Sequence, residues 1–492
     1  MQPSLGEIDI GILILYCLAM IAMGIYYTRK SQTAEQFMVA GRSIPAWAAG
    51  LAVMSTYTSS ISYIATPGKA FDANWHPIIF SICIFPVAWL VCRYAVPFYR
   101  RTQLISVYAF LEQKLGPWAR VYAGLSFLLY MLGRVAVILY LVALLLRAFV
   151  PWNIGLVILA IGLVTIVYTL LGGMEAVIWT DVVQSVIMIV GILFCAVSLS
   201  LHIFSTSEPL IQTAIDNNKF SFGTWDLSLS SRTIWVMIIY GVTENLRNLL
   251  ADQNYVQKYS SVPTLEDARR SIWIAMLIYI PLTAVFLYIG TALFAFYSAP
   301  AHPLGDGITR GDQVFPYFIA TQLPAGLKGL VIAAIIAAAM STVDSALNCS
   351  ATVLLLDFHK RYFNPEIEDR ASVVFLRLAT AVWGLLGTGF ALLMIRARSA
   401  LDVWWQISGI FGGGILGLFI LSLLRVRLRL WQGLASVAVS IAVISWGTFA
   451  RNLPPSWRWA QCDLDGIIVG AIGTLVLMVV AVVFGLTNRT ET

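Results

Sequence analysis

The stretch that decides the fold reads Ala337-Ala-Ala-Met-Ser-Thr-Val-Asp-Ser-Ala-Leu-Asn348, inside an apolar segment long enough to cross a bilayer. On a helix, Ser341, Asp344 and Ser345 share one face, and Thr342 lies beside them. A carboxylate at membrane depth costs roughly 2.5–3.5 kcal/mol on insertion scales. The face offers only oxygen ligands, which hard cations prefer, so it predicts an ion or solute site. The alternative is local, with hydroxyls bonded to their own helix and the aspartate paired with an arginine.

The composition is that of a membrane protein with many spans. Of 492 residues, 59% are hydrophobic and 11% are charged, whereas soluble domains carry about 25% charged residues. The net charge of +6 is spread over short loops, so nucleic acid is not an expected partner, and neither is an obligate protein partner. The six cysteines and four histidines are scattered without metal-ligand spacing, which argues against a disulfide framework or a zinc site.

Apolar runs of roughly 20 residues predict about thirteen helices in one membrane domain, residues 1–492. The runs lie near 8–26, 45–70, 76–98, 119–146, 152–170, 176–204, 233–256, 271–298, 325–356, 372–395, 401–424, 430–449 and 464–486. The first follows an acidic segment and is interpreted as a spanning helix, not a signal peptide. Lys and Arg, with Lys258 counted as a loop residue, predominate on one side, which predicts an external N-terminus and a cytoplasmic C-terminus.

Polar residues interrupt two of these runs. The second contains seven hydroxyl residues within Ser55–Ser62, followed by Pro67-Gly68, and the seventh contains the charged stretch Gly241–Asn248. Interrupted helices at corresponding positions of two halves indicate an inverted-repeat transporter. Unwound backbone at membrane depth has to line a cavity or bind a ligand. For Ser55–Ser62 the alternative is a Ser/Thr-rich packing surface.

Three segments resemble the sodium/solute symporter family, namely Ser55–Pro67, Gly172–Gln184 and Ala337–Asn348. The resemblance is nearest to the bacterial sialic acid transporters of that family, through Trp47–Gly50, Gly133–Val137 and Trp179–Asp181. It implies an all-α, leucine-transporter-like core of two inverted five-helix repeats in a bacterial inner membrane. The repeats would span 45–205 and 233–425, with flanking helices at 8–26 and 430–486.

The same resemblance implies a first sodium site with five neutral oxygen ligands. These are the backbone carbonyls of Ser55, Thr58 and Ala338 and the hydroxyls of Ser341 and Thr342. A second sodium site, found in some members, would use Asp181, Ser341, Asp344 and Ser345. The sialic acid members carry a hydroxyl residue where this chain has Asp344. Two adjacent carboxylates cannot both stay ionised without a cation. There are therefore three possibilities: a sodium ion bridges them, one of them is protonated, or Asp344 pairs elsewhere. We favour the bridging sodium ion.

Arg134 lies midway along the fourth predicted span, too deep for its side chain to reach water. Its planar fork suits a carboxylate, and in the sialic acid members an arginine at the matching position holds the substrate carboxylate. A structural pair with Glu244 or another internal acid is the alternative. The matched cavity positions are Tyr57, Ser59, Ser62 and Ser81, of which Tyr57 and Ser81 depart from the sialic acid members. Gln253 and Gln406 are weaker candidates.

The sequence thus predicts a sodium-coupled secondary active symporter, not an enzyme, that imports a small polar solute by alternating access. Sialic acid or a related carboxylated sugar is the first candidate, and a neutral sugar or monocarboxylate is the alternative. Expected ligands are Na⁺, the solute and the lipid bilayer. A cation channel is the rival class, but no repeated filter motif is visible. A membrane enzyme would need a Ser/His or metal-binding constellation, and the few histidines lie near span ends.

Overall fold

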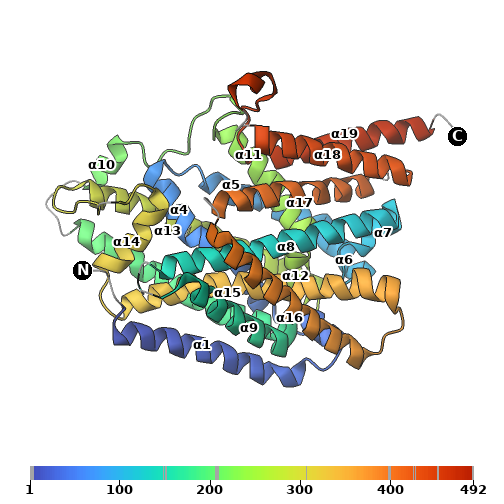
Figure 1. Ribbon diagram of the computed structural model, residues 1–492, viewed down its shortest axis with the longest axis horizontal. Coiled ribbons are helices and arrows are strands. Elements are labelled where there is room, and N and C mark those ends of the chain that lie inside the picture. Colours follow the sequence, from blue (N-terminus) through green and yellow to red (C-terminus); the bar gives the residue numbers. More distant parts are fainter. Residues whose placement is uncertain are drawn as a thin grey trace.

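The computed structural model describes residues 5–147, 149, 152–204, 210–305, 307–396, 400–424, 426, 428–450 and 454–489. Within these residues every regular element is a helix, as the sequence predicts. Figure 1 shows the long helices packed side by side in one bundle, with α1 along one side and α18 and α19 along the opposite side.

The helices of the first half are α1 (Glu7–Tyr27), α2 (Ala34–Val39), α3 (Ala46–Tyr57), α4 (Ser60–Asp72), α5 (Ile78–Leu90), α6 (Val96–Thr102), α7 (Ala109–Leu115), α8 (Pro117–Leu146), α9 (Ile154–Phe204) and α10 (Leu210–Asp216). Those of the second half are α11 (Ile234–Leu246), α12 (Gln253–Ser260), α13 (Leu265–Ser298), α14 (Gly311–Gln322), α15 (Leu327–Val353), α16 (Asp369–Leu393), α17 (Ala400–Leu423), α18 (Leu430–Phe449) and α19 (Val469–Arg489). Nine of the described helices are long and apolar enough to cross a membrane, or ten if the bent pair Ala34–Arg42 and Ala46–Tyr57 forms one span. The count of about thirteen spans stays a prediction, because interrupted helices fail a test based on length.

The 51-residue helix α9 contains two of the predicted runs, and its backbone bends between them. Gly173 adopts φ 60° and ψ −156° there, a conformation that is essentially confined to glycine. A Cβ atom at this position would lie 2.9–3.0 Å from Phe37. Gly173 therefore lets α9 change direction while α2 packs directly against the bend.

The first interruption lies where the sequence predicts it. Helix α3 ends at Tyr57, Thr58 and Ser59 have non-helical backbone angles, and α4 begins at Ser60. The second lies further along the chain than the predicted stretch Gly241–Asn248. Helix α11 continues to Leu246 and widens into a π-helical turn, and the backbone becomes extended only at Asp252.

A local ion pair explains this displacement. The Arg247 guanidinium binds the Glu244 carboxylate at 2.5 and 3.0 Å, one helical turn away. Because these two charges satisfy each other on one face of the helix, they do not require the helix to unwind.

Helix α15 is the central helix of the bundle. It packs against α9, α8, α16 and α1, and nearly all of its most apolar stretch is buried. The polar face around Ser341 and Asp344 therefore lies inside the protein and not against lipid.

Helix α12 corrects one expectation from the sequence. Its residues are all buried, and the Lys258 side chain is fully buried. The interpretation of Lys258 as a cytoplasmic loop charge is therefore wrong. Hydropathy cannot distinguish a polar loop from a helix whose polar groups bond to the rest of the protein.

Candidate ion and solute sites

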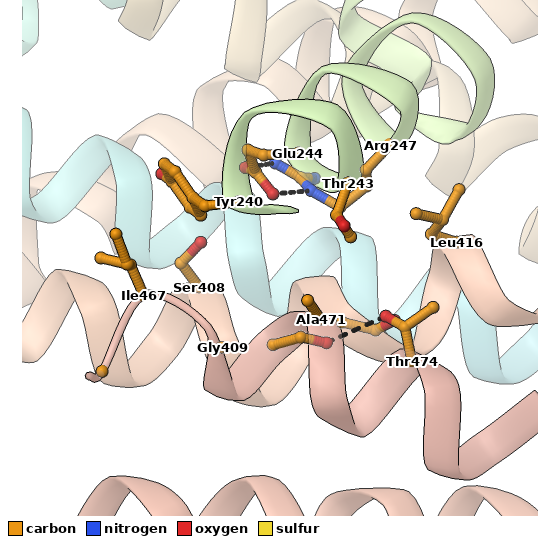
Figure 2. Close-up of a pocket in the computed structure, with 13 residues that line it drawn as sticks. Tyr240, Thr243, Glu244, Arg247, Ser408, Gly409, Leu416, Ile467, Ala471 and Thr474 are labelled. Carbon is orange, nitrogen blue, oxygen red and sulfur yellow. Dashed lines mark hydrogen bonds and ion pairs between the residues drawn. The ribbon is translucent and has the colours of Figure 1, made fainter. Parts of the chain in front are cut away.

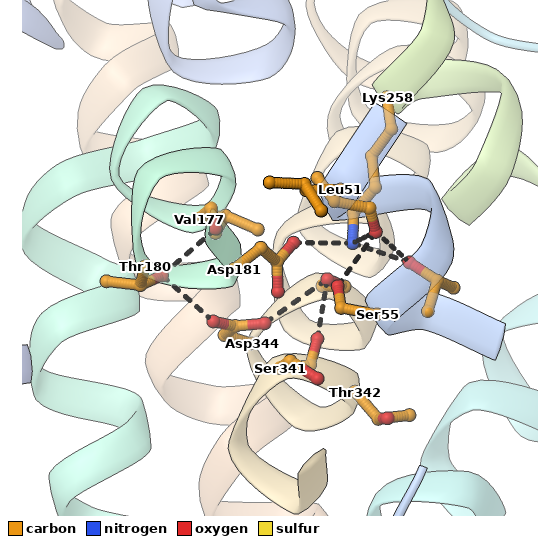
Figure 3. Close-up of polar contacts among 12 residues, drawn as sticks. Leu51, Ser55, Val177, Thr180, Asp181, Lys258, Ser341, Thr342 and Asp344 are labelled. Carbon is orange, nitrogen blue, oxygen red and sulfur yellow. Dashed lines mark hydrogen bonds and ion pairs between the residues drawn. The ribbon is translucent and has the colours of Figure 1, made fainter. Parts of the chain in front are cut away.

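The residues expected to form the first sodium site lie around the end of α3 and in the middle of α15. All five side chains are buried, and α3 packs on α15. Ser341 Oγ and Thr342 Oγ1 donate to the Ala338 carbonyl at 3.2 and 3.0 Å. Donating the hydrogen leaves the hydroxyl lone pairs available to a cation. Figure 3 shows Ser55 of α3 facing Ser341 of α15 across this interface.

The residues expected to form the second sodium site lie beside it, on α9 and α15. Asp344 accepts hydrogen bonds from the Tyr168 hydroxyl at 2.9 Å and from Ser345 Oγ at 3.2 Å. A more distant contact, at 3.4 Å, comes from Thr180. The structure thus gives Asp344 hydroxyl partners, and among the described residues it forms no ion pair with an arginine.

Asp181 has a partner that the sequence analysis missed. Lys258 Nζ lies 2.7 Å from Asp181 Oδ2, and the two side chains are fully buried. The same ammonium donates to Thr56 Oγ1 at 2.6 Å and to the Ala52 carbonyl at 3.0 Å. Figure 3 shows Asp181 between Lys258 on one side and Asp344 on the other. No sequence signal pointed to this pair, because the two residues lie 77 positions apart.

A cavity of about 180 Å³ lies next to the interrupted part of α3 and α4. Four of the predicted solute residues line it, namely Tyr57, Ser59, Ser62 and Arg134. Sequence reasoning missed most of the remaining wall, which includes Tyr130, Tyr240, Asn248, Tyr255 and Tyr279. Aromatic residues are frequent in membrane proteins, so nothing in the sequence distinguished these tyrosines.

Arg134 is buried, with 8% of its surface exposed. Its Nη2 donates to the Thr56 carbonyl at 3.0 Å, and among the described residues it forms no ion pair. Glu244 is bound instead by Arg247, which also contacts Asp252 at 3.2 Å. The alternative of a structural pair between Arg134 and Glu244 is therefore wrong.

Two further predicted solute residues, Ser81 and Gln253, are not among the residues that line this cavity. Ser81 donates to Thr283 Oγ1 at 3.1 Å. Gln253 accepts from the Val107 backbone amide and donates to the Ile105 carbonyl, both at 2.9 Å, which anchors α12. The side chain of Gln406 lies outside the described residues.

A second, smaller cavity of about 90 Å³ lies on the other side of α11, facing α17 and α19. Figure 2 shows the Glu244–Arg247 pair on its wall, opposite Ser408 and Thr474. Tyr240 and Glu244 line both cavities. A thin wall of side chains on α11 therefore separates the solute cavity from the C-terminal helices.

Two interrupted helices, a face of buried oxygen ligands and an adjoining polar cavity define a secondary active transporter. The model of the sodium:solute symporter family matches residues 37–434, and the chain belongs to this family. It is 30% identical to the sodium/sialic acid symporter NanT of Aliivibrio fischeri, covering 97% of this chain and 92% of that protein. It is also 30% identical to the sodium/sialic acid symporter SiaT of Proteus mirabilis, covering 95% of each.

A solved structure of a Na⁺-coupled sialic acid symporter, substrate-bound and outward-open, has the same architecture. Its TM-score is 0.89 at 29% identity, and 98% of each chain is covered. The leucine-transporter-like fold is thus confirmed, and so is the class of the protein. It is a multi-span membrane symporter with Na⁺ as the coupling ion, and it is not an enzyme.

Proposed function

We propose that this symporter imports a small carboxylated solute, with sialic acid as the first candidate. The supporting observation is the Arg134 guanidinium, buried at the cavity wall without an ion-pair partner among the described residues. A buried charge without a counterion is destabilising. A solute carboxylate would supply that counterion, and the planar fork of arginine suits its two oxygens. The sialic acid symporters among the relatives agree with this choice.

The first sodium site is proposed at the interface of α3 and α15. Its ligands are the carbonyls of Ser55, Thr58 and Ala338 and the hydroxyls of Ser341 and Thr342. Because α3 ends at Tyr57, carbonyls of its last turn lack intrahelical amide partners. A sodium ion there would fix the end of α3, where the Thr56 carbonyl holds Arg134. Ion and solute would then raise each other's affinity, as reciprocal linkage requires.

The orientation and location are also proposals. We infer an external N-terminus, a cytoplasmic C-terminus and a bacterial inner membrane, supported by the basic loops even after Lys258 is removed from the count, and by the bacterial relatives. Sodium can supply the free energy for uptake. A tenfold inward sodium gradient contributes about 1.4 kcal/mol per sodium ion, and a membrane potential of 100 mV adds about 2.3 kcal/mol per transported charge.

A short monocarboxylate is the second candidate solute, and the cavity favours it. Its 180 Å³ is below the roughly 300–1,000 Å³ of typical ligand pockets. The Tyr57 ring fills part of the space, with its centroid 4.7 Å from Tyr255 and 5.1 Å from Tyr279. Sialic acid would require these rings to move apart.

Uptake by purified protein in liposomes tests the proposal. Under an inward sodium gradient, we compare labelled sialic acid, a short monocarboxylate and a neutral hexose. Arg134→Ala should lower kcat/KM for the anionic solute about 10–100-fold, since it removes charge-assisted hydrogen bonds worth roughly 1.5–3 kcal/mol. Arg93→Ala, at an exposed position, is the control. Unchanged anion uptake by Arg134→Ala would contradict the proposal, and hexose uptake alone would identify a neutral substrate.

A further inference from the structure

The buried charges on α9, α12 and α15 include a cation that belongs to the protein itself. The three contacts of Lys258 Nζ are a carboxylate, a hydroxyl and a backbone carbonyl, at 2.7, 2.6 and 3.0 Å. An ammonium has three hydrogens to donate, so these contacts use all of them. The same oxygen types bind hard metal cations in proteins.

We propose that Lys258 is a built-in cation that takes the place of a second sodium ion, so that transport uses one exchangeable sodium ion. This inference rests on the proposed sodium-coupled uptake of a carboxylated solute. It also changes the expectation for the second sodium site, because the ammonium already occupies the cation position at Asp181 Oδ2.

The charge balance of the cluster supports a single ion. Asp181 and Asp344 contribute two negative charges and Lys258 one positive charge, and all three side chains are buried. One sodium ion makes the cluster neutral, whereas a second would leave an extra buried positive charge, which is costly. That one ion is the sodium ion proposed between α3 and α15, whose ligand Ser341 also belongs to the expected second site.

Lys258 also makes the mechanical link that a second metal ion would provide. Its contacts join Asp181 of α9 to Ala52 and Thr56 in the last turns of α3. The Thr56 carbonyl in turn accepts from Arg134 at the solute cavity. Helix α3, which ends at the proposed sodium site, is therefore held in place by the fixed positive charge of Lys258.

The sodium-to-solute ratio of the unmodified protein is the first test. In liposomes, fluxes of radioactive sodium and of a labelled monoanionic solute should match one to one, with a sodium Hill coefficient near one. Uptake should be electroneutral. A membrane potential set by a potassium gradient and valinomycin should therefore not change the rate of uptake. A ratio of two, or uptake driven by the potential, would overturn the inference. Uptake without any sodium dependence would instead refute the proposed function.

Variants of Lys258 provide the second test. Lys258→Gln leaves two uncompensated carboxylates, so the Hill coefficient should rise toward two and monoanion uptake should become electrogenic. Lys258→Arg keeps the charge, and the double variant Lys258→Gln/Asp181→Asn removes the pair; both should keep one sodium ion per solute. A folded Lys258→Gln protein with unchanged stoichiometry would show that the lysine is only structural. If that variant does not fold, the unmodified protein and the double variant still decide the question.

Discussion

At the scale of single residues, Thr56 connects the solute cavity to the buried charges. Its carbonyl accepts from Arg134 at 3.0 Å and from the Tyr255 hydroxyl at 3.4 Å, while its hydroxyl accepts from Lys258 at 2.6 Å. The carbonyl lies in the last turn of α3, where the following residues no longer supply helical amides. The end of one helix thus creates the contact through which the proposed ion and solute sites would influence each other.

Glu112 illustrates how a residue outside the spans contributes to stability. Its carboxylate binds Arg120 at 2.7 Å and Arg361 at 2.6 Å, which joins α7 and α8 to the π-helical stretch Leu354–Phe363 that continues α15. Burial raises the pKa of Glu112, but the hydrogen bonds from Arg361 and Arg120 outweigh burial, and the pKa lies below its usual 4.5. A depressed pKa means that this stabilisation is present above pH 4.5 and is lost as the pH falls through the lowered value.

We therefore predict that Glu112→Gln lowers the melting temperature at pH 7 by on the order of 1–3 °C, corresponding to about 1 kcal/mol. The difference from the unmodified protein should shrink as the pH falls below 4.5, because protonation of Glu112 removes its charge. Melting curves between pH 3.5 and 7 check this, with exposed Glu366→Gln as the control. A difference that persists at low pH would show that Glu112 acts through packing alone.

At the scale of helices, the two interruptions were not equally predictable. Seven hydroxyl residues within Ser55–Ser62 located the break between α3 and α4, because so many hydroxyl groups are unfavourable in a helix that faces lipid. The charges of Gly241–Asn248 did not locate the second break. There Glu244 and Arg247 neutralise each other within the helix, and the backbone becomes extended only at Asp252.

The bend in α9 gives a prediction for one helix. Gly173→Ala should destabilise the protein by about 1–3 kcal/mol, because alanine disfavours the positive φ and its Cβ would press on Phe37. Thermal melting of the purified protein measures the loss. Gly11→Ala in α1, where the added Cβ meets nothing within 4 Å, should leave the melting temperature nearly unchanged. Equal stability of the two variants would mean that α9 can bend without glycine.

At the scale of the whole molecule, the proposed sodium site joins helices from the two halves of the chain. In this proposal the end of α3 would supply carbonyls, and α15 would supply Ala338 and two hydroxyls from the centre of the bundle. An ion shared by these helices stabilises whichever arrangement of the two halves brings them together. Sodium binding is therefore expected to change the stability of the whole fold as well as uptake.

Sodium should raise the melting temperature of the purified protein, while potassium should not. At a sodium concentration ten times Kd, mass action contributes about 1.4 kcal/mol. Ser341→Ala and Thr342→Ala should lose this sodium-dependent increase. Ser350→Ala, also in α15 but with a hydroxyl that has no hydrogen-bond partner among the described residues, should keep it. A full sodium response in the Ser341→Ala protein would place the ion elsewhere.

The sequence by itself determined the membrane class, the interrupted second span, the oxygen-bearing face at Ser341–Ser345 and the interior position of Arg134. Each follows from the free energy of placing one residue type at membrane depth, which is a local property. Only the tertiary structure decided which charges from distant helices meet, as in the pairs Lys258–Asp181 and Arg361–Glu112. Ion pairing and cavity shape depend on atoms brought together from distant helices, and one chain's composition does not record those distances.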